Sequence, residues 1–354
     1  MNPGLSKLIE DATREADAFE TRHAQRLDAY RQAIAQGVES AVNTLHEDVR
    51  ALSAGDPLCD TMMQLATEYV LWLRWTLFDL PRYAIVFETP LATFRERVTA
   101  TALIYQSIRI LDDVLDTHLT YKDLHSTLLG SATEKLTGND ASSSDLPTNL
   151  SLLTSVLLSV EGLRRLANLC KDGGPSVLIE VLEAYRKTVV GAILEYSPHS
   201  SPTTHYLVRL VDLKNVSYSR ILIAALSVDK EKHQMLLAWI DELYVLSQQL
   251  NDLNDLRRDV ASGQPNFIWE MLKERQLMHA IDASPDRIRD RAAIAAVEDF
   301  YGEAFLKLGS KAYTLPGDAR AVAMLKWRDA IGYARFLGLF PDDSEQEATG
   351  IRIT

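Results

Sequence analysis

Apolar side chains recur every three or four positions along most of the chain, which is the period of an amphipathic helix. From Leu5 to Leu52 the pattern predicts one long helix, or two helices in line if Gly37 interrupts them. It returns near 60–80, 91–118, 147–171, 175–195, 205–227, 232–260, 284–308 and 318–338. No sustained alternation of β-branched residues indicates a sheet. We therefore predict an all-α fold.

Turn-forming residues separate these segments without forming a long linker. The breaks read SAGDP at 53–57, TGNDASSSDLPTN at 137–149, DGGP at 172–175, SPHSSP at 197–202 and DASPD at 282–286. Composition does not shift across them, and no internal repeat is visible. The pattern indicates a single helical domain.

Composition excludes several classes of protein. The 354 residues are 47% hydrophobic and 24% charged, which is typical of a globular chain with a sizeable core. The net charge is −12 and Lys and Arg do not cluster, so we expect no binding of nucleic acid. Apolar runs such as ILIAAL at 221–226 are far shorter than the ~20 residues of a membrane span, so we expect no transmembrane segment.

The cysteines and the N-terminus predict a cytoplasmic protein. Cys59 and Cys170 are the only cysteines, which fits a reducing compartment and provides no thiolate metal site. The first twenty residues are acidic and amphipathic, unlike a signal or transit peptide.

Three aspartates interrupt the apolar segment IYQSIRILDDVLDTH at 104–118. Asp112 and Asp116 share a helix face because they are four residues apart, and Asp113 lies beside them. An unpaired buried carboxylate is costly, so these groups must be solvated, paired or bound to a cation. Alone, the motif also fits a solvated helix end that happens to be acidic.

A second acidic stretch, QQLNDLNDLRRDVASGQPNF at 248–267, makes a cation site the better interpretation. Asn251, Asp255 and Asp259 follow one another at intervals of four residues, with Asp252 beside the first. Two rows of oxygen ligands suit Mg²⁺, a hard cation that takes one or two carboxylates together with phosphate oxygens. Arg257 and Arg258 could pair with these carboxylates or hold a phosphate.

The two motifs in an all-helical chain resemble those of the trans-prenyl diphosphate synthases and the related class I terpene synthases. Asp112, Asp113 and Asp116 match the first aspartate-rich motif. Asn251, Asp252, Asp255 and Asp259 match the second motif, DDxxDxxxD, except that Asn251 stands in place of its first Asp. The same positions also fit the spacing of the Asn/Ser/Glu metal triad of terpene cyclases.

This resemblance implies a large helical bundle around a central apolar cavity, which would span residues 56–340. Residues 1–55 would then be an N-terminal helical extension and 341–354 a C-terminal tail. It also implies a prenyl diphosphate substrate, three Mg²⁺ ions once substrate is bound, and a homodimer. The carboxylates of Asp112, Asp113 and Asp116 would be catalytic, and the metal ligands would be Asp112, Asp116, Asn251, Asp252, Asp255 and Asp259.

Further residues are assigned to the substrate through the same resemblance. YLVRLVDLKNVSYSRIL at 206–222 resembles the helix whose lysine contacts the diphosphate, which corresponds to Lys214. Arg109 and Arg258 are assigned to substrate binding as well. Ser107 and Ile108 lie about one turn before Asp112 and would line the wall of the cavity. Alternatively, Ser107 packs against a neighbouring helix.

The sequence departs from the chain-elongating members at two places. They carry a Gly-Lys-Arg cluster before the first motif and an Arg-Arg pair after it, which hold a second diphosphate. Here the upstream segment has only Arg74 and Arg82, and the downstream segment THLTYKDLH has only Lys122. This favours a terpene synthase that cyclises or rearranges the carbocation of one allylic diphosphate. The alternative is prenyl transfer to isopentenyl diphosphate or to another acceptor.

Other interpretations stay open at this point. Aromatic residues before the first motif either line a pocket and stabilise a carbocation or belong to the core; they are Trp72, Trp75, Phe78, Tyr83 and Phe87. His118 and His125 are either ligands or ordinary surface and core histidines. A helical di-iron protein would need Glu-x-x-His pairs, which the sequence lacks. A catalytically inactive relative that docks a partner through residues 1–55 is a further possibility.

Overall fold

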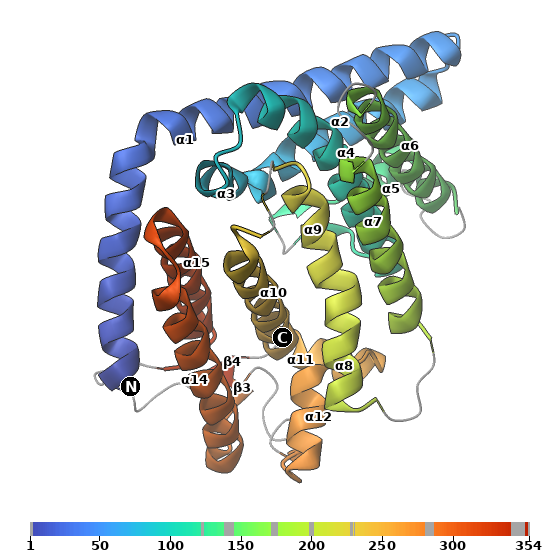
Figure 1. The fold of residues 1–354 in the computed structure, drawn as a ribbon. Helices are drawn as coiled ribbons and strands as arrows, with labels where there is room; N and C mark the ends of the chain where they lie inside the picture. The colour runs from blue at the N-terminus through green and yellow to red at the C-terminus, as the bar shows by residue number, and fades with distance from the viewer. Residues whose placement is uncertain are drawn as a thin grey trace. The chain divides into compact units, whose positions relative to one another are not determined.

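The computed structural model describes residues 3–121, 124–137, 145–170, 176–197, 202–226, 229, 231–279, 287–340 and 351–352 (Figure 1). Helices dominate these residues, and the strands among them, β1 to β4, have two residues each. The predicted all-α fold is therefore confirmed. The chain divides into two compact units, and each is described by itself.

Unit 2 comprises Gln25–Glu183 and Arg220–Val228. It holds the later part of α1 (Pro3–Leu52) and the first part of α7 (Ser176–Glu195). The elements between them are α2 (Pro57–Leu73), the 3₁₀ helix η1 (Arg74–Leu77), α3 (Leu80–Val86), α4 (Leu91–Leu115), β1 (Thr120–Tyr121), β2 (His125–Ser126), α5 (Leu128–Thr137) and α6 (Leu146–Leu169). Strands β1 and β2 pair antiparallel, with Thr120 opposite Ser126.

Unit 1 comprises Met1–Ala24, Ala184–Ser219 and Asp229–Thr354. Besides parts of α1 and α7, its elements are α8 (Thr204–Val211), the π-helix η2 (Asp212–Val216), the start of α9 (Ser217–Ile223), α10 (Gln234–Asn254), α11 (Leu256–Ser262), α12 (Phe267–Glu274), β3 (Arg287–Ile288), α14 (Arg291–Thr314), α15 (Gly317–Phe336) and β4 (Ile351–Arg352). Strand β3 pairs antiparallel with β4.

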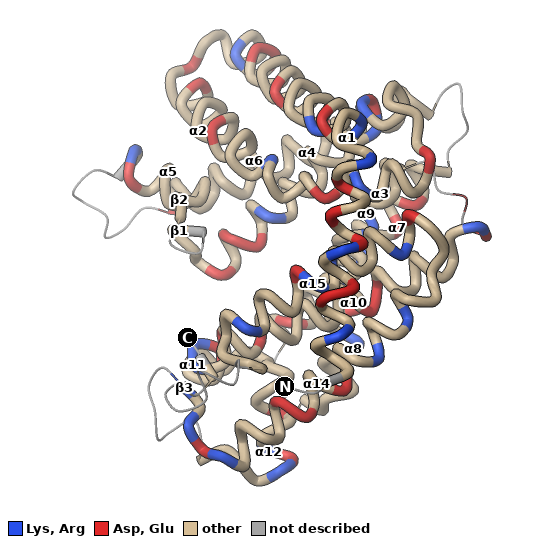
Figure 2. Tube along the Cα trace, turned by 90° about the vertical axis from the view of Figure 1, so that its left-hand side faces the viewer, with Lys and Arg blue, Asp and Glu red and all other residues tan. Residues whose placement is uncertain are grey.

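Helix α1 is continuous, so Gly37 does not interrupt it. The glycine instead permits a close approach, because a Cβ atom there would lie 2.3 Å from Oγ1 of Thr99 in α4. Blue and red segments are interspersed along α1 in Figure 2, as expected for the solvent-facing side of an amphipathic helix.

The inner face of α1 contributes to the core of both units. In unit 2 the Tyr30 hydroxyl donates to the Thr89 carbonyl oxygen, and the Tyr30 ring meets that of Phe94 edge to face at 4.9 Å. In unit 1, Leu5 and Phe19 are buried. The exposed Arg22 lies 2.8 Å from the carboxylate of Asp318. The predicted domain boundary near residue 55 stays a prediction, and most of the predicted tail (341–350 and 353–354) lies outside the described residues.

Three helices were absent from the periodic segments: α3, α5 and α12, which have 7, 10 and 8 residues. Such short helices offer too few turns for a 3.6-residue period to emerge. The segment predicted to begin at 284 also differs, since α14 starts at Arg291 after β3, and 284–286 lie outside the described residues.

Close packing of α4 on α6 organises the core of unit 2. Gly162 in α6 makes it possible, since a Cβ atom there would lie 2.6 Å from Cγ1 of Ile104 and 2.7 Å from the Ala100 carbonyl oxygen. In unit 1, the indole N–H groups of Trp239 and Trp327 donate to backbone carbonyls of α14 at 2.9 and 2.8 Å. These two buried indole N–H groups are therefore satisfied within unit 1.

Helix α6 is the one described helix that is long and apolar enough to cross a membrane by length and composition. In that window 44% of the residues are buried inside the protein. Its contact with α4 through Gly162 fits a core helix, and the prediction that no segment spans a membrane stays a prediction.

Gly162→Ala should destabilise the protein by ~1–3 kcal/mol, because the added methyl must displace the backbone of α4. Urea unfolding measures the change. Gly332→Ala is the matched control: no atom lies within 4 Å of its added Cβ, and alanine is the better helix former. Equal unfolding midpoints for the two variants would contradict this account of the contact.

Candidate functional site

The first acidic motif ends α4. Asp116 is the C-cap, and Thr117 has the left-handed backbone (φ +55°) that closes a helix. Two hydrogen bonds complete a Schellman motif: His118 N–H donates to the Asp113 carbonyl at 2.8 Å, and Thr117 N–H to that of Val114 at 3.2 Å. The negative end of the helix dipole lies here, so carboxylates at this end favour a bound cation.

Arg109 supplies a cation to two of the three carboxylates. Its guanidinium lies 3.0 Å from Asp112 and 2.8 Å from Asp113. His118 Nδ1 lies 4.0 Å from Asp113 and 3.9 Å from Asp116. Arg109, assigned to substrate from the sequence, is thus part of the carboxylate cluster itself.

Asp113 differs from its neighbours because it is fully buried. The Tyr69 hydroxyl of α2 donates to its second oxygen at 2.5 Å, so both oxygens have partners. Burial raises the pKa of Asp113 despite the Arg109 charge. The side chains of Asp112 and Asp116 keep 22% and 20% of their exposure, which leaves these two accessible to a ligand.

The segment after the motif is held by Thr127 and Gly130. Thr127 Oγ1 donates to the His118 carbonyl at 2.6 Å and accepts from Gly130 N–H at 3.0 Å. Gly130 is required here, because a Cβ atom would lie 2.0 Å from the Leu119 carbonyl oxygen. In β2, His125 stacks on Trp72 with ring centres 4.5 Å apart.

The second acidic motif lies where α10 passes into α11. Asp255 ends one helix and begins the other, yet its N–H still bonds to Asn251 O at 2.8 Å and Asp259 N–H to Asp255 O at 3.0 Å. The predicted row of Asn251, Asp255 and Asp259 therefore stays close to one face.

An arginine bridges this row as well. Arg258 lies 2.9 Å from Asp255 and 3.6 Å from Asp259. Among the described residues, Oδ1 of the buried Asp259 has no hydrogen-bond partner. Both motifs thus consist of carboxylates around one guanidinium.

Asp252 holds neighbouring elements together. Its oxygens accept from Gln248 at 2.9 Å and from the N–H of Phe267, in the first turn of α12, at 3.1 Å. Burial raises the pKa of Asp252 to about 7 and that of Asp259 to about 6. Burial also raises the pKa of Tyr333 to about 12, and the charge of Asp255 adds to the effect.

Asn266 is a residue of this site that the sequence reasoning missed. Its amide donates to the Asp252 carbonyl at 2.7 Å and to the Asp259 carboxylate at 2.8 Å, and its oxygen caps α12 by accepting from Trp269 N–H. An asparagine directly before the apolar residues FIW is a helix N-cap signal that could have found it.

Lys214 lies in the π-helix η2 and is paired with Glu195 of α7. Gly191 permits this approach, because a Cβ atom there would lie 2.7 Å from Lys214 N. The next residue, Asn215, donates to Gln248 at 2.7 Å, and Gln248 in turn donates to Asp252. Short π-helical segments occur frequently at functional sites. The structure thus joins the Lys214 segment to the second motif.

Ser107 contacts a neighbouring helix. Its side chain is fully buried, and its hydroxyl lies 2.5 Å from that of Ser159 in α6. Ser155 donates to the Ser107 carbonyl at 2.8 Å. The structure therefore supports the alternative in which Ser107 packs against a neighbouring helix, because small hydroxyl residues let α4 and α6 approach. Ile108 is also buried.

The aromatic residues before the first motif fall into two groups. Tyr83 and Phe87 are buried and stack on each other at 6.3 Å, which makes them core. Trp75 and Phe78 are exposed. Trp72 lies between Tyr69 and His125, close to the partner of Asp113.

The donors present suit Mg²⁺, since both motifs offer oxygen atoms. Among the described residues, no three His, Cys, Asp or Glu side chains already form a cluster that could hold a metal ion. An ion that takes one or two carboxylates and completes its shell with phosphate oxygens and water does not need one.

No protein-family model and no curated protein sequence matches the chain. Several solved structures are similar in fold, including the following three. The first is geranylgeranyl pyrophosphate synthetase from Pyrococcus horikoshii, with 16% identity and a TM-score of 0.57; the match covers 85% of this chain and 98% of that one. The second is geranylgeranyl pyrophosphate synthase from Corynebacterium glutamicum, with 14% identity and a TM-score of 0.59, covering 86% of this chain and 98% of that one. The third is polyprenyl synthase from Caulobacter crescentus, with 13% identity and a TM-score of 0.57, covering 89% of this chain and 96% of that one.

The second of these structures contains isoprenyl diphosphate and magnesium, and the third contains isoprenyl diphosphate and calcium. At these identities the likeness concerns the fold. The resemblance stated from the two motifs is confirmed to that extent: the chain has the fold of the isoprenyl diphosphate synthases.

The stability of the metal-free protein should fall as pH rises from about 4 to about 7. Folded Asp259 and Asp252 retain protons up to pKa values of about 6 and about 7, whereas an unfolded aspartate releases its proton near ~4. The unfolded chain then binds fewer protons, so stability decreases with pH across this window. Thermal unfolding of wild type and Asp252→Asn measures it, and the variant should show a shallower slope. Identical dependence of the unfolding temperature on pH in the two proteins would refute the raised pKa of Asp252.

Ser107→Phe should lower the unfolding temperature by several degrees, because the ring has no space between α4 and α6. Any preference for prenyl chain length should stay unchanged. Relative rates on geranyl, farnesyl and geranylgeranyl diphosphate measure that preference. A selective loss of the longest substrate would restore the cavity-wall role of Ser107.

Proposed function

We propose that this protein is a class I isoprenoid enzyme that ionises an allylic prenyl diphosphate and releases diphosphate. One observation carries the proposal: both acidic motifs place partly accessible carboxylates around a single arginine, on a fold whose solved examples bind isoprenyl diphosphate with Mg²⁺ or Ca²⁺. Fold alone would not carry it, because one fold hosts many functions.

The proposed Mg²⁺ ligands have side-chain oxygen atoms that are either partly exposed or, in the buried Asp259, without a hydrogen-bond partner among the described residues. They are Asp112 and Asp116 in the first motif, and Asn251, Asp255 and Asp259 in the second. When bound, Mg²⁺ supplies positive charge to a departing diphosphate. Asp113 and Asp252 act as positioning residues instead, since their oxygens already bond to Tyr69, Arg109, Gln248 and Phe267.

The protein's own cations would hold the diphosphate. Arg109 and Arg258 already neutralise carboxylates, so a cation at those carboxylates frees the guanidinium groups to donate to phosphate oxygens. Lys214 adds an ammonium group on the segment joined to Asp252 through Gln248. The central apolar cavity implied by the resemblance would exclude water from the carbocation.

We favour cyclisation or rearrangement over transfer to isopentenyl diphosphate. A second diphosphate needs its own cations, and of the two upstream arginines Arg82 is paired with Asp79 at 2.5 Å. Downstream, the sequence offers Lys122, which lies outside the described residues, and no arginine pair. Prenyl transfer remains the second candidate, because the similar structures are prenyl diphosphate synthases. A homodimer in the cytoplasm is part of the proposal.

Incubation with Mg²⁺ and geranyl, farnesyl or geranylgeranyl diphosphate, with and without isopentenyl diphosphate, tests the proposal. We expect a hydrocarbon or alcohol product and released diphosphate without isopentenyl diphosphate. Asp112→Asn and Asp255→Asn should each lower the rate more than tenfold, or ~1.4 kcal/mol of barrier.

Asp28→Asn is the control, because this aspartate is exposed on α1 and paired only with Arg31 at 3.2 Å. Its rate should equal that of wild type. Longer prenyl diphosphates formed only with isopentenyl diphosphate would establish the transferase instead. Retention of more than a tenth of the rate by the Asp112 variant would exclude the metal role.

A further inference from the structure

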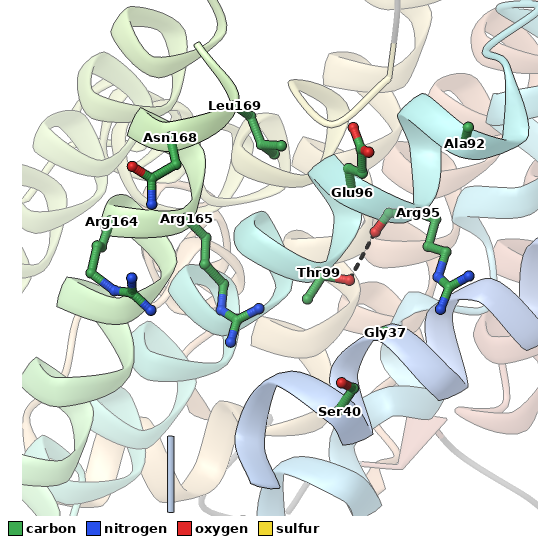
Figure 3. Close-up of a pocket in the computed structure, with 10 residues that line it drawn as sticks. All are labelled: Gly37, Ser40, Ala92, Arg95, Glu96, Thr99, Arg164, Arg165, Asn168 and Leu169. Atoms are coloured by element: carbon green, nitrogen blue, oxygen red, sulfur yellow. Dashed lines mark hydrogen bonds between the residues drawn. The ribbon is translucent and has the colours of Figure 1, made fainter. Parts of the chain in front are cut away.

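An open cavity of about 590 Å³ lies within unit 2, between α1, α4 and α6 (Figure 3). Three arginines line it: Arg95 from α4, and Arg164 and Arg165 from α6. In Figure 3 the two α6 arginines and Arg95 stand on opposite sides, with Thr99 between them and Ser40 of α1 below. The close contact of Gly37 with Thr99 brings α1 against α4 here.

This cavity is separate from the first acidic motif. Arg95 and Asp112 lie on the same helix, and a rise of ~1.5 Å per residue places their backbones ~25 Å apart. A ligand held by Arg95 therefore could not reach the carboxylates at the other end of α4.

A buried carboxylate orients the two α6 arginines. Glu161 accepts from Arg164 through two nitrogen atoms, Nε at 2.7 Å and Nη2 at 2.8 Å, and from Arg165 Nε at 2.6 Å. Burial alone would raise the pKa of Glu161, but these two arginines lower it below its usual value. The guanidinium groups are thus ordered before any ligand binds, which reduces the entropic cost of binding.

Several donors of these arginines remain available. Among the described residues, no acceptor bonds to the Nη atoms of Arg165, to Nη1 of Arg164 or to the guanidinium of Arg95. Of the described residues that line the cavity, three are arginines and one, Glu96, is acidic. Two further carboxylates act on the α6 arginines: Glu161 bonds to both, and the charge of Asp48 acts on Arg164. The attraction for an anion therefore comes from the guanidinium donors that face the cavity and have no acceptor in the described part of the chain, rather than from a large net positive charge.

We propose that this cavity binds the phosphate group of a small phosphorylated molecule, as a site independent of the acidic motifs. Guanidinium groups match phosphate oxygens with paired hydrogen bonds, and Asn168 adds an amide donor. The volume exceeds that of one phosphate and falls within the range of small-molecule sites. Ala92 and Leu169 provide apolar surface for the organic part of the ligand.

Isothermal titration of the full chain with inorganic pyrophosphate, in EDTA, tests this site without divalent cations. We expect saturable binding of one pyrophosphate by wild type. Arg95→Ala should weaken it at least tenfold without loss of folding, because this side chain is exposed and supports no other group. Arg26→Ala, which removes an exposed arginine of α1 outside the cavity, should bind as wild type does.

The Asp112→Asn variant tests whether this site is independent of the proposed active site. Its affinity for pyrophosphate in EDTA should equal that of wild type. Absence of saturable binding by wild type would overturn the proposal. So would equal affinities of the Arg95 and Arg26 variants, or binding that disappears in Asp112→Asn and persists in Arg95→Ala. None of these outcomes bears on the ionisation of prenyl diphosphates.

Discussion

Carboxylates inside an apolar helical protein are the constraint around which this structure is arranged. Asp113, Asp252 and Asp259 are largely withdrawn from water, and burial raises the pKa of each. Each accepts a hydrogen bond from outside its own helix. Tyr69 of α2 donates to Asp113, the N–H of Phe267 in the first turn of α12 donates to Asp252, and Asn266, the N-cap of α12, donates to Asp259. The carboxylates therefore fix the positions of their neighbours as well as their own. A substitution that removed one donor would leave a buried charge with too few partners.

The remaining carboxylates fit the proposed metal-binding role. Asp112, Asp116 and Asp255 keep part of their exposure, and the first two lie at the helix end where the dipole disfavours negative charge. In each motif one arginine supplies a positive charge to these carboxylates in the metal-free chain. An arginine that pairs with carboxylates can also bind a phosphate group, because its planar fork of N–H donors matches pairs of phosphate oxygens as well as pairs of carboxylate oxygens. If a cation bound the carboxylates and a phosphate bound the arginine, the carboxylates and the guanidinium group of each motif would all keep a partner of opposite charge.

Much of this could be predicted from the sequence, and the failures have physical causes. Long helices and both acidic rows follow from periodicity, because many turns repeat the same pattern. The two roles within each row could not be predicted: Asp113 and Asp116 are chemically identical, and only contacts with Tyr69 and solvent distinguish them. The Lys214 segment approaches Gly191 of another helix closely, and the hydroxyl of Ser107 meets that of Ser159 in α6. Such contacts between distant segments leave no local signal.

The same limit applies to the choice between cyclisation and prenyl transfer. The fold and the metal-binding chemistry are shared by both reactions, so neither can distinguish them. Prenyl transfer to isopentenyl diphosphate differs in that a second diphosphate must bind to cationic side chains next to the first diphosphate. The arginines that this chain does gather lie elsewhere, around Glu161 near the C-terminal end of α6, ~25 Å along α4 from the first motif. Positive charge placed so far away cannot hold an acceptor diphosphate against the reacting carbon. The distribution of arginine is therefore part of the support for our proposal of an enzyme that folds one prenyl chain on itself, and for the proposed phosphate site in a separate cavity.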